Sequence, residues 1–204
     1  MAKSRPVLLT AALSAAAVLG YLAYRTLGTS GDAPVTVADA PAAATSQTAA
    51  KLPDFSLGNL AGEPQSIQSW PGKPLLINFW ATWCAPCLRE IPMLKELQAT
   101  RPDLQVVGVA IDKRDPVVEF AGNIEFNYPI LIGQSEAWAA AAALGVNIYA
   151  LPFTIFTAAD GSILGVHTGE LHSEHLEEFS SIVDDLAAGR IDIEQARSRI
   201  AGRI

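Results

Sequence analysis

A continuous apolar run from Pro74 to Trp80 (PLLINFW) constrains the fold more than any other stretch of this 204-residue chain. A strand with apolar residues at successive positions is covered on both faces, as the central strands of α/β sheets are. A helical stretch follows it and extends to about Ala99. This strand–helix succession predicts an α/β fold with the run at the centre of the sheet.

Strands and helices alternate along the rest of the chain. Asp115-Pro116 predicts a helix start, because Asp can cap a helix and Pro fits its first position. Gly145 ends another helix, and Ala159-Asp160-Gly161 predicts a hairpin turn. The remaining expected elements are strands at 54–57, 65–68, 104–111, 128–132, 153–157 and 162–168, and helices at 135–144, 173–188 and 191–204. This order predicts a mixed sheet flanked by helices, with an N-terminal β-hairpin formed by the first two strands.

The first residues of the chain contain a candidate membrane anchor. Lys3 and Arg5 precede an uncharged run from Pro6 to Tyr24, which is near the shortest length that spans a hydrocarbon core of about 30 Å. Positive residues before such a run favour a cytoplasmic N-terminus. We therefore expect residues 1–27 to form a single-pass anchor in a bacterial inner membrane, with the catalytic domain in the periplasm.

A cleaved signal peptide is the alternative interpretation of this segment. The A-x-A triplet Ala38-Asp39-Ala40 lies too far beyond the apolar run for a comfortable cleavage site, and no cysteine just after the run supports a lipoprotein anchor. Under both interpretations, the domain that follows is exported.

Composition divides the remainder of the chain. Residues 28–50 are rich in Ala, Thr, Ser, Pro and Gly, and such a segment cannot offset the entropy of ordering, so we expect a flexible tether. Residues 51–190 are expected to form one domain, and residues 191–204 a short C-terminal helix. The formal charge of −7 and the pI near 4.9 argue against nucleic-acid binding, which needs a basic surface.

Cys84 and Cys87 are the only two cysteines of the chain. In an exported domain such a pair can cycle between dithiol and disulfide, because disulfides persist outside the cytoplasm. Cys84 is expected at a helix N-terminus, where unpaired N–H groups and the helix dipole stabilise a thiolate. Pro86 suits the first turn because it has no N–H to leave unsatisfied. The spacing predicts that Cys84 attacks, or is attacked, and that the more shielded Cys87 resolves the mixed disulfide.

Two other uses of the cysteine pair are weaker. A zinc site needs further ligands, and nothing in the sequence brings His172 and His175 to Cys84. A purely structural disulfide gains little from closing so short a loop. We therefore expect redox chemistry, without a metal or a cofactor.

Glu90 shares a helical face with Cys87, Met93, Leu94 and Leu97, given 3.6 residues per turn. A carboxylate in an apolar stripe is partly desolvated, which raises its pKa and suits it to proton exchange with nearby thiols. The alternative is a partly exposed glutamate without a role. We favour a catalytic Glu90.

The motif NFWATWCAPC, placed after a buried strand, resembles the thioredoxin superfamily. The PDF opening at Pro53, the GKP at Gly72 and the segment ADGSILGVHTGEL resemble its membrane-anchored TlpA/ResA-type branch, over about Leu52 to Leu186. The resemblance implies a thioredoxin-like fold for residues 51–190 and a periplasmic thiol–disulfide oxidoreductase. It also implies a membrane electron donor and clients such as apocytochrome c or copper-site maturation factors.

The same resemblance implies further site residues. Family members have a cis-proline at the position of Pro152, and the backbone of the preceding residue, here Leu151, pairs with the client. Trp83, Ala85 and Pro86, which lie beside or between the cysteines, are expected to contact the client too.

Asn78 departs from the cytosolic thioredoxins, which have a buried aspartate at this place in the strand. A neutral amide cannot accept a proton, so Glu90 is the leading substitute. ResA-type members have a glutamate at this offset from the CxxC, and it tunes the active-site thiols.

Three functions remain open at this point. A reductase of exported proteins, with catalytic Cys84, Cys87, Glu90 and Pro152, is the leading one. A dithiol oxidase or isomerase would use the same residues at a higher reduction potential, roughly −120 mV against about −270 mV for thioredoxin. A metallochaperone would instead bind copper or zinc through the two cysteines.

Overall fold

The central apolar run forms β3 (Leu75–Trp80), and all of its residues are buried. In the computed structural model, which describes residues 50–145 and 150–204, β3 lies between two other buried strands. It pairs in parallel with β4 (Gln105–Ile111) and antiparallel with β6 (Phe153–Thr157). Because every residue of β3 is buried, the coverage of both faces that the sequence predicted is confirmed.

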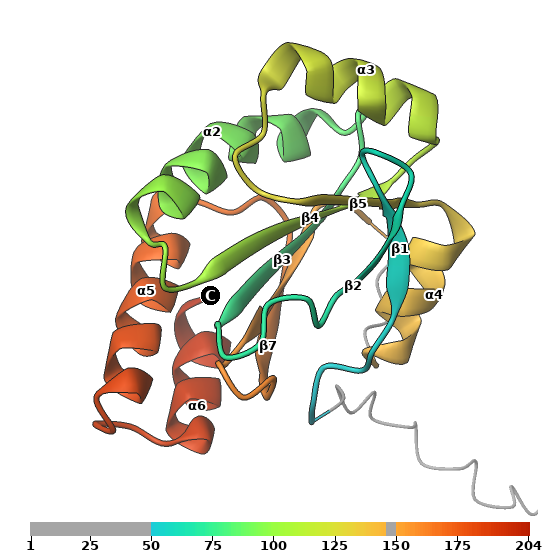
Figure 1. The fold of residues 1–204 in the computed structure, drawn as a ribbon. Helices are drawn as coiled ribbons and strands as arrows, with labels where there is room; N and C mark the ends of the chain where they lie inside the picture. The colour runs from blue at the N-terminus through green and yellow to red at the C-terminus, as the bar shows by residue number, and fades with distance from the viewer. Residues whose placement is uncertain (1–49, 146–149) are drawn as a thin grey trace, which may run out of the picture. The chain divides into compact units, whose positions relative to one another are not determined.

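The sheet has seven strands in the order β2-β1-β5-β4-β3-β6-β7 (Figure 1). Strands β3, β4 and β5 are parallel, whereas the pairs β1–β2 and β6–β7 at the two edges are antiparallel. The sheet is therefore mixed, as predicted. The remaining strands of the sheet are β1 (Ser56–Asn59), β2 (Pro64–Ser66), β5 (Ile130–Gly133) and β7 (Ile163–Thr168).

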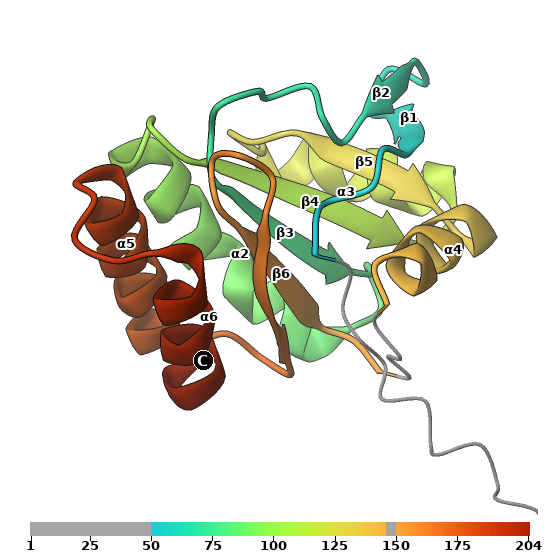
Figure 2. The ribbon, with the colours of Figure 1, turned by 90° about the horizontal axis from the view of Figure 1, so that it is seen from below.

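Helices cover both faces of the sheet, and each face has its own apolar core. One core joins Leu76, Trp80 and Phe156 of the sheet to four helices, and the other joins Ile77 and Phe79 to one helix. Figures 1 and 2 show α5 and α6 together on one side and α4 on the other. The four helices on the first face are α2 (Ala85–Thr100), α3 (Arg114–Ile124), α5 (Ser173–Ala187) and α6 (Ile193–Arg203), and the second face carries α4 (Ser135–Ala143).

The alternation of side chains along β3 decides which residues face α2. Leu76 and Trp80 belong to the core that includes α2, and Asn78 lies between them on the same face because side chains alternate with a period of two. Thr154 of β6 is the direct partner of Asn78 in the ladder. The sheet therefore presents two polar side chains to the inner side of α2.

Several element boundaries differ from the sequence predictions, including the start of a helix. Helix α3 begins at Arg114 with Lys113 as its N-cap, not at Asp115-Pro116. The amide of Lys113 donates to the carboxylate of Asp112 at 2.7 Å, so the helix starts earlier, and proline is tolerated because first-turn amides have no intrahelical partner.

Other differences concern the strands β5, β1 and β2. Ladder pairing of β5 begins at Ile130 instead of Tyr128, because the intervening Pro129 has no N–H to donate. The first two strands are displaced by one or two residues, to Ser56–Asn59 and Pro64–Ser66, and Asn59 accepts the turn amides of Ala61 and Glu63 through its side chain.

The first described residues join the sheet beside β7. Lys51 bridges Ser162, the amide of Ile163 donates to the carbonyl of Ala50 at 3.2 Å, and the amide of Leu52 donates to Gly161 at 2.8 Å. The expected anchor at 1–27 and nearly all of the expected tether at 28–50 lie outside the described residues. Within residues 50–145 and 150–204, no helix has the length and apolar character that a membrane crossing requires.

Candidate active site

A disulfide joins Cys84 and Cys87 at the start of α2, with Cα atoms 5.3 Å apart. Cys84 is the N-cap in extended conformation, and its carbonyl accepts the amide of Leu88 at 3.2 Å. Pro86 lies in the first turn, where its missing N–H costs no hydrogen bond. The pair thus occupies the end of the central strand and the beginning of the next helix, as the sequence predicted.

The two sulfur-bearing residues differ in accessibility. Cys84 is 5% exposed and Cys87 is fully buried. The neighbouring Trp83 is 70% exposed, Ala85 is exposed and Pro86 is half-buried. A partner that reaches this edge can therefore meet Cys84 and these three neighbours before Cys87, which fits the predicted roles of the two cysteines.

The turn before Cys84 is fixed by a carboxylate from the neighbouring strand. Asp112, at the end of β4, accepts hydrogen bonds from the amide and the hydroxyl of Thr82, at 3.1 and 2.5 Å. The amide of Cys84 donates to the carbonyl of Ala81 at 3.2 Å. These bonds hold the approach to α2 and so the orientation of Cys84.

Glu90 is fully buried, one helical turn after Cys87. Its carboxylate accepts two hydrogen bonds, one from the Asn78 amide group at 2.9 Å and one from the backbone amide of Leu171 at 2.5 Å. Asn78 also donates to the hydroxyl of Thr154 at 3.1 Å. The apolar stripe that placed Glu90 on the inner face of the helix is confirmed, and Asn78 is its direct partner.

Burial is the main influence on the ionisation of Glu90. Desolvation raises the pKa of Glu90 to about 7, against the lowering effects of the Leu171 amide, the Asn78 side chain and the Arg89 cation; the Glu170 carboxylate raises it further. A carboxyl group that titrates near neutral pH can both accept and return a proton. It lies on the same helical face as Cys87, so proton exchange with the thiols is chemically reasonable.

The peptide bond between Leu151 and Pro152 is cis, as the resemblance implied. Because Phe153 pairs with Phe79 in the ladder, Pro152 lies at the same edge of the sheet as the disulfide. Leu151 is partly buried and packs against the core cluster that contains both cysteines. The structure therefore brings Cys84, Cys87, Glu90 and Pro152 to one region.

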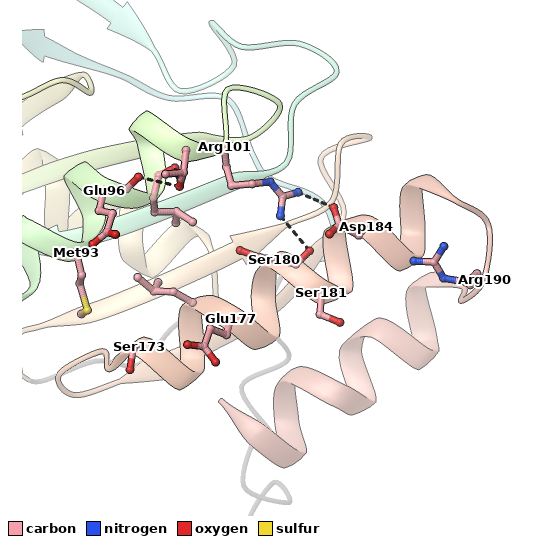
Figure 3. Close-up of a pocket in the computed structure, with 12 residues that line it drawn as sticks. Met93, Glu96, Arg101, Ser173, Glu177, Ser180, Ser181, Asp184 and Arg190 are labelled. Carbon is pink, nitrogen blue, oxygen red and sulfur yellow. Dashed lines mark hydrogen bonds and ion pairs between the residues drawn. The ribbon is translucent and has the colours of Figure 1, made fainter.

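A groove of about 600 Å³ between α2 and α5 lies apart from this region (Figure 3). Arg101 crosses part of it and pairs with Asp184 at 2.7 Å. The groove is lined by Met93, Glu96, Leu97, Thr100, Arg101, Ser173, Leu176, Glu177, Ser180, Ser181, Asp184 and Arg190. None of the predicted site residues is among them, so this groove is not the candidate active site.

Three histidines gather near the start of α5. The ring of His175 lies 4.5 Å from that of His167 and 5.6 Å from that of His172, measured between centroids. No group of three or more His, Cys, Asp or Glu side chains in the described part of the chain is arranged to hold a metal ion. The structure therefore gives no support to a metal role for these histidines.

Sequence reasoning missed four contributors to the site: Thr82, Asp112, Thr154 and the amide of Leu171. Asp112 and Thr154 carried a usable signal, because both are polar residues at or near ends of buried strands beside β3. The Leu171 amide carried none, since it lies 81 residues from Glu90 in the chain and any residue except proline could supply it.

Comparisons with known proteins agree with this geometry. A family model described as Redoxin matches residues 47–186. Thioredoxin-like protein YneN of Bacillus subtilis strain 168 is 36% identical over 137 residues, which cover 65% of this chain and 78% of YneN. Thiol-disulfide oxidoreductase ResA of Geobacillus thermodenitrificans strain NG80-2 is 30% identical over 165 residues, which cover 79% of this chain and 86% of ResA. The crystal structure of a thiol:disulfide interchange protein from Chlorobium tepidum TLS superposes with a TM-score of 0.57 at 29% identity, covering 66% of this chain and 93% of that protein.

Proposed function

Because this chain belongs to the redoxin family and is a thiol–disulfide oxidoreductase related to ResA, we propose that it reduces disulfides in exported protein clients. The observation that carries the proposal is the unequal burial of the residues Cys84 and Cys87, 5% and 0% exposed, beside the buried carboxyl group of Glu90. One sulfur can meet a client, the second can resolve the product, and the carboxyl group can take the proton that this second step releases.

The reaction starts from the dithiol. The Cys84 thiolate attacks one sulfur of the client disulfide, and the other client sulfur leaves and takes up a proton. Cys87 then gives its proton to the Glu90 carboxylate, and its sulfur attacks Cys84. The second client sulfur leaves and is protonated, so two electrons have passed to the client and the chain ends as the disulfide seen here.

The backbone of the first turn of α2 stabilises a thiolate at Cys84. The amides of Ala85 and Cys87 have no intrahelical hydrogen-bond acceptor, so they can stabilise negative charge at the N-cap. The exposed Trp83 and the partly buried Leu151 offer apolar and backbone contacts for a client. A reactive cysteine in such surroundings attacks at mildly acidic pH.

We further propose an exported location, with residues 1–27 as an anchor in the bacterial inner membrane and the domain in the periplasm. The uncharged run after Lys3 and Arg5 supports this proposal. The resemblance to the TlpA/ResA branch supports a membrane thiol donor, and clients such as apocytochrome c or copper-site maturation factors. Labelling Cys84 in intact cells with a membrane-impermeant maleimide, after a membrane-impermeant reductant has opened its disulfide, tests the location, and absence of labelling before lysis would refute it.

The function is tested by trapping and by a redox equilibrium. Cys87→Ala should accumulate a mixed disulfide between Cys84 and the client, which mass spectrometry identifies, and Cys84→Ala should not. Equilibrating the wild-type chain with glutathione gives its potential. A value near −270 mV supports a reductase, and a value near −120 mV would replace this proposal with an oxidase.

A further inference from the structure

The loop Gly169–Leu171, between β7 and α5, meets the active site at three places. The amide of Gly169 donates to the carbonyl of Pro152 at 3.0 Å. Glu170 forms a two-bond ion pair with Arg89, with Nε–Oε1 and Nη2–Oε2 distances of 2.8 and 2.5 Å. The amide of Leu171 donates to Glu90 at 2.5 Å. The loop therefore links the cis-proline segment to the buried carboxylate.

Two of these contacts join consecutive residues of the helix to consecutive residues of the loop. Arg89 of α2 pairs with Glu170, and the next residue of α2, Glu90, accepts the amide of Leu171. A bidentate arginine–carboxylate pair fixes orientation as well as distance. Glu170 thus holds the peptide group that follows it against the end of the Glu90 side chain.

The two donors to Glu90 differ in how firmly the fold holds them. Asn78 lies within a central strand and is tied to Thr154 of the neighbouring strand. The Leu171 amide belongs to a loop, so its position depends on what secures that loop. Because an N–H donor favours the charged form of a carboxylate, any displacement of this loop changes the balance between the acid and its anion.

We propose that Arg89 and Glu170 are positioning residues, whose ion pair holds the Leu171 amide on Glu90 and so controls how readily Glu90 releases its proton. The inference rests on the proposed role of Glu90 in proton exchange with the thiols. The ion pair lies at the surface of the molecule, whereas the carboxyl group whose ionisation it influences is buried from solvent.

Direct charge effects make a different prediction. Arg89, on the same helix as Glu90, lowers the pKa of Glu90, and Glu170, on the loop, raises it. Tyr128, before β5, is a buried neutral phenol whose own pKa is raised by burial and by Glu90. His172, the N-cap of α5, lowers the pKa of Glu170 through its charge. If only charge matters, neutralising Glu170 should lower the pKa of Glu90.

Positioning predicts the opposite sign. Glu170→Gln breaks the ion pair, loosens the Leu171 amide and should raise the pKa of Glu90. Arg89→Lys keeps the positive charge but loses the two-bond geometry, so it should raise the pKa as well, whereas charge alone predicts no change. We expect a rise of about half a unit to one unit, which is a threefold to tenfold change in proton affinity.

The pKa is measured on the oxidised full-length chain by carbon-13 NMR of labelled glutamate carboxyl groups, and the Glu90 signal is the one that Glu90→Gln removes. Arg190→Lys is the matched control. Its ion pair with Asp185 has side-chain exposures of 59% and 22%, against 60% and 24% for Arg89 and Glu170. This control should leave the Glu90 titration unchanged.

A lower pKa in Glu170→Gln, or an unchanged pKa in Arg89→Lys, would overturn the positioning proposal, as would an equal change in Arg190→Lys. Because the titration uses the disulfide form without a client, it separates this proposal from the proposed function. Should the predicted shifts occur in a chain that reduces no client, only the function would fail. The pH profile of Cys84 alkylation in the reduced variants gives a second readout and should move in the same direction as the Glu90 titration.

Discussion

Replacing Glu90 by glutamine should change how the stability of the oxidised domain depends on pH. Glu90 has an ordinary pKa of 4.5 and a pKa of about 7 in the folded chain. Between these values the folded state keeps a proton that the unfolded state has lost, so stability falls as the pH rises through this window. Each unit of pKa corresponds to about 1.4 kcal/mol, and the wild-type chain should lose roughly 3 kcal/mol from this group.

Glutamine cannot ionise, so Glu90→Gln should escape this loss. The side-chain oxygen of glutamine can accept the Leu171 amide. Its NH2 group can donate to the Asn78 side-chain oxygen if the Asn78 amide group is flipped. The variant should therefore gain roughly 3 kcal/mol relative to wild type between pH 4.5 and pH 8. The fold should be retained, because the two side chains have nearly the same volume.

Urea unfolding of the full-length oxidised chain, followed by tryptophan fluorescence at several pH values, measures this difference. Subtracting the variant from wild type cancels the histidines and the other carboxyl groups. Glu96→Gln, at an exposed position of the same helix, is the control for loss of a surface carboxylate. A wild-type-minus-Glu90→Gln difference that stays constant between pH 5 and pH 8 would refute a desolvated Glu90.

Three further substitutions test the parts of the fold that support the site. Asp112→Ala removes the acceptor of the Thr82 hydroxyl and amide; it should lower the free energy of unfolding by about 2 kcal/mol in urea and slow Cys84 alkylation, and unchanged values would argue against the anchoring role. Gly165→Ala places a Cβ atom 2.3 Å from Ile200 Cγ2, so a loss of about 1–3 kcal/mol is expected, with partial rescue by Ile200→Ala; an undiminished thermal midpoint would contradict this. Leu94→Ala empties a fully buried position and should cost about 2–5 kcal/mol by urea unfolding, whereas a loss below 1 kcal/mol would show that the core closes around it.

The sequence predicted those features that local patterns determine. The apolar run, the CxxC after it and the helical face of Glu90 follow from spacing along the chain, and the structure places them as expected. The start of α3 was wrong because a capping pattern at Asp115 competed with the contact between Asp112 and the Lys113 amide. The Asp112 carboxylate also accepts hydrogen bonds from Thr82. A local sequence pattern does not predict this second contact.

The surroundings of Glu90 show a different limit. Asn78 could be connected with Glu90 before the fold was known, because Glu90 was predicted on the buried face of the helix that follows the strand of Asn78. Glu170 and the Leu171 amide could not, because their approach depends on where the turn after β7 meets α2. The type of a residue does not reveal whether its backbone amide will donate to a distant side chain. The partners of a surface ion pair that lie 81 residues apart can be identified only once the fold is known.

The point at which the chain joins the sheet has a consequence for access to the disulfide. Ala50 and Lys51 attach beside Ile163 and Ser162, next to the end of β6 that lies furthest from Phe79 and the cysteines. The first described residues, Ala50 and Lys51, therefore lie at the opposite end of the sheet from the reactive sulfur. A protein client of the proposed reaction could therefore approach Cys84 without meeting Ala50 or Lys51.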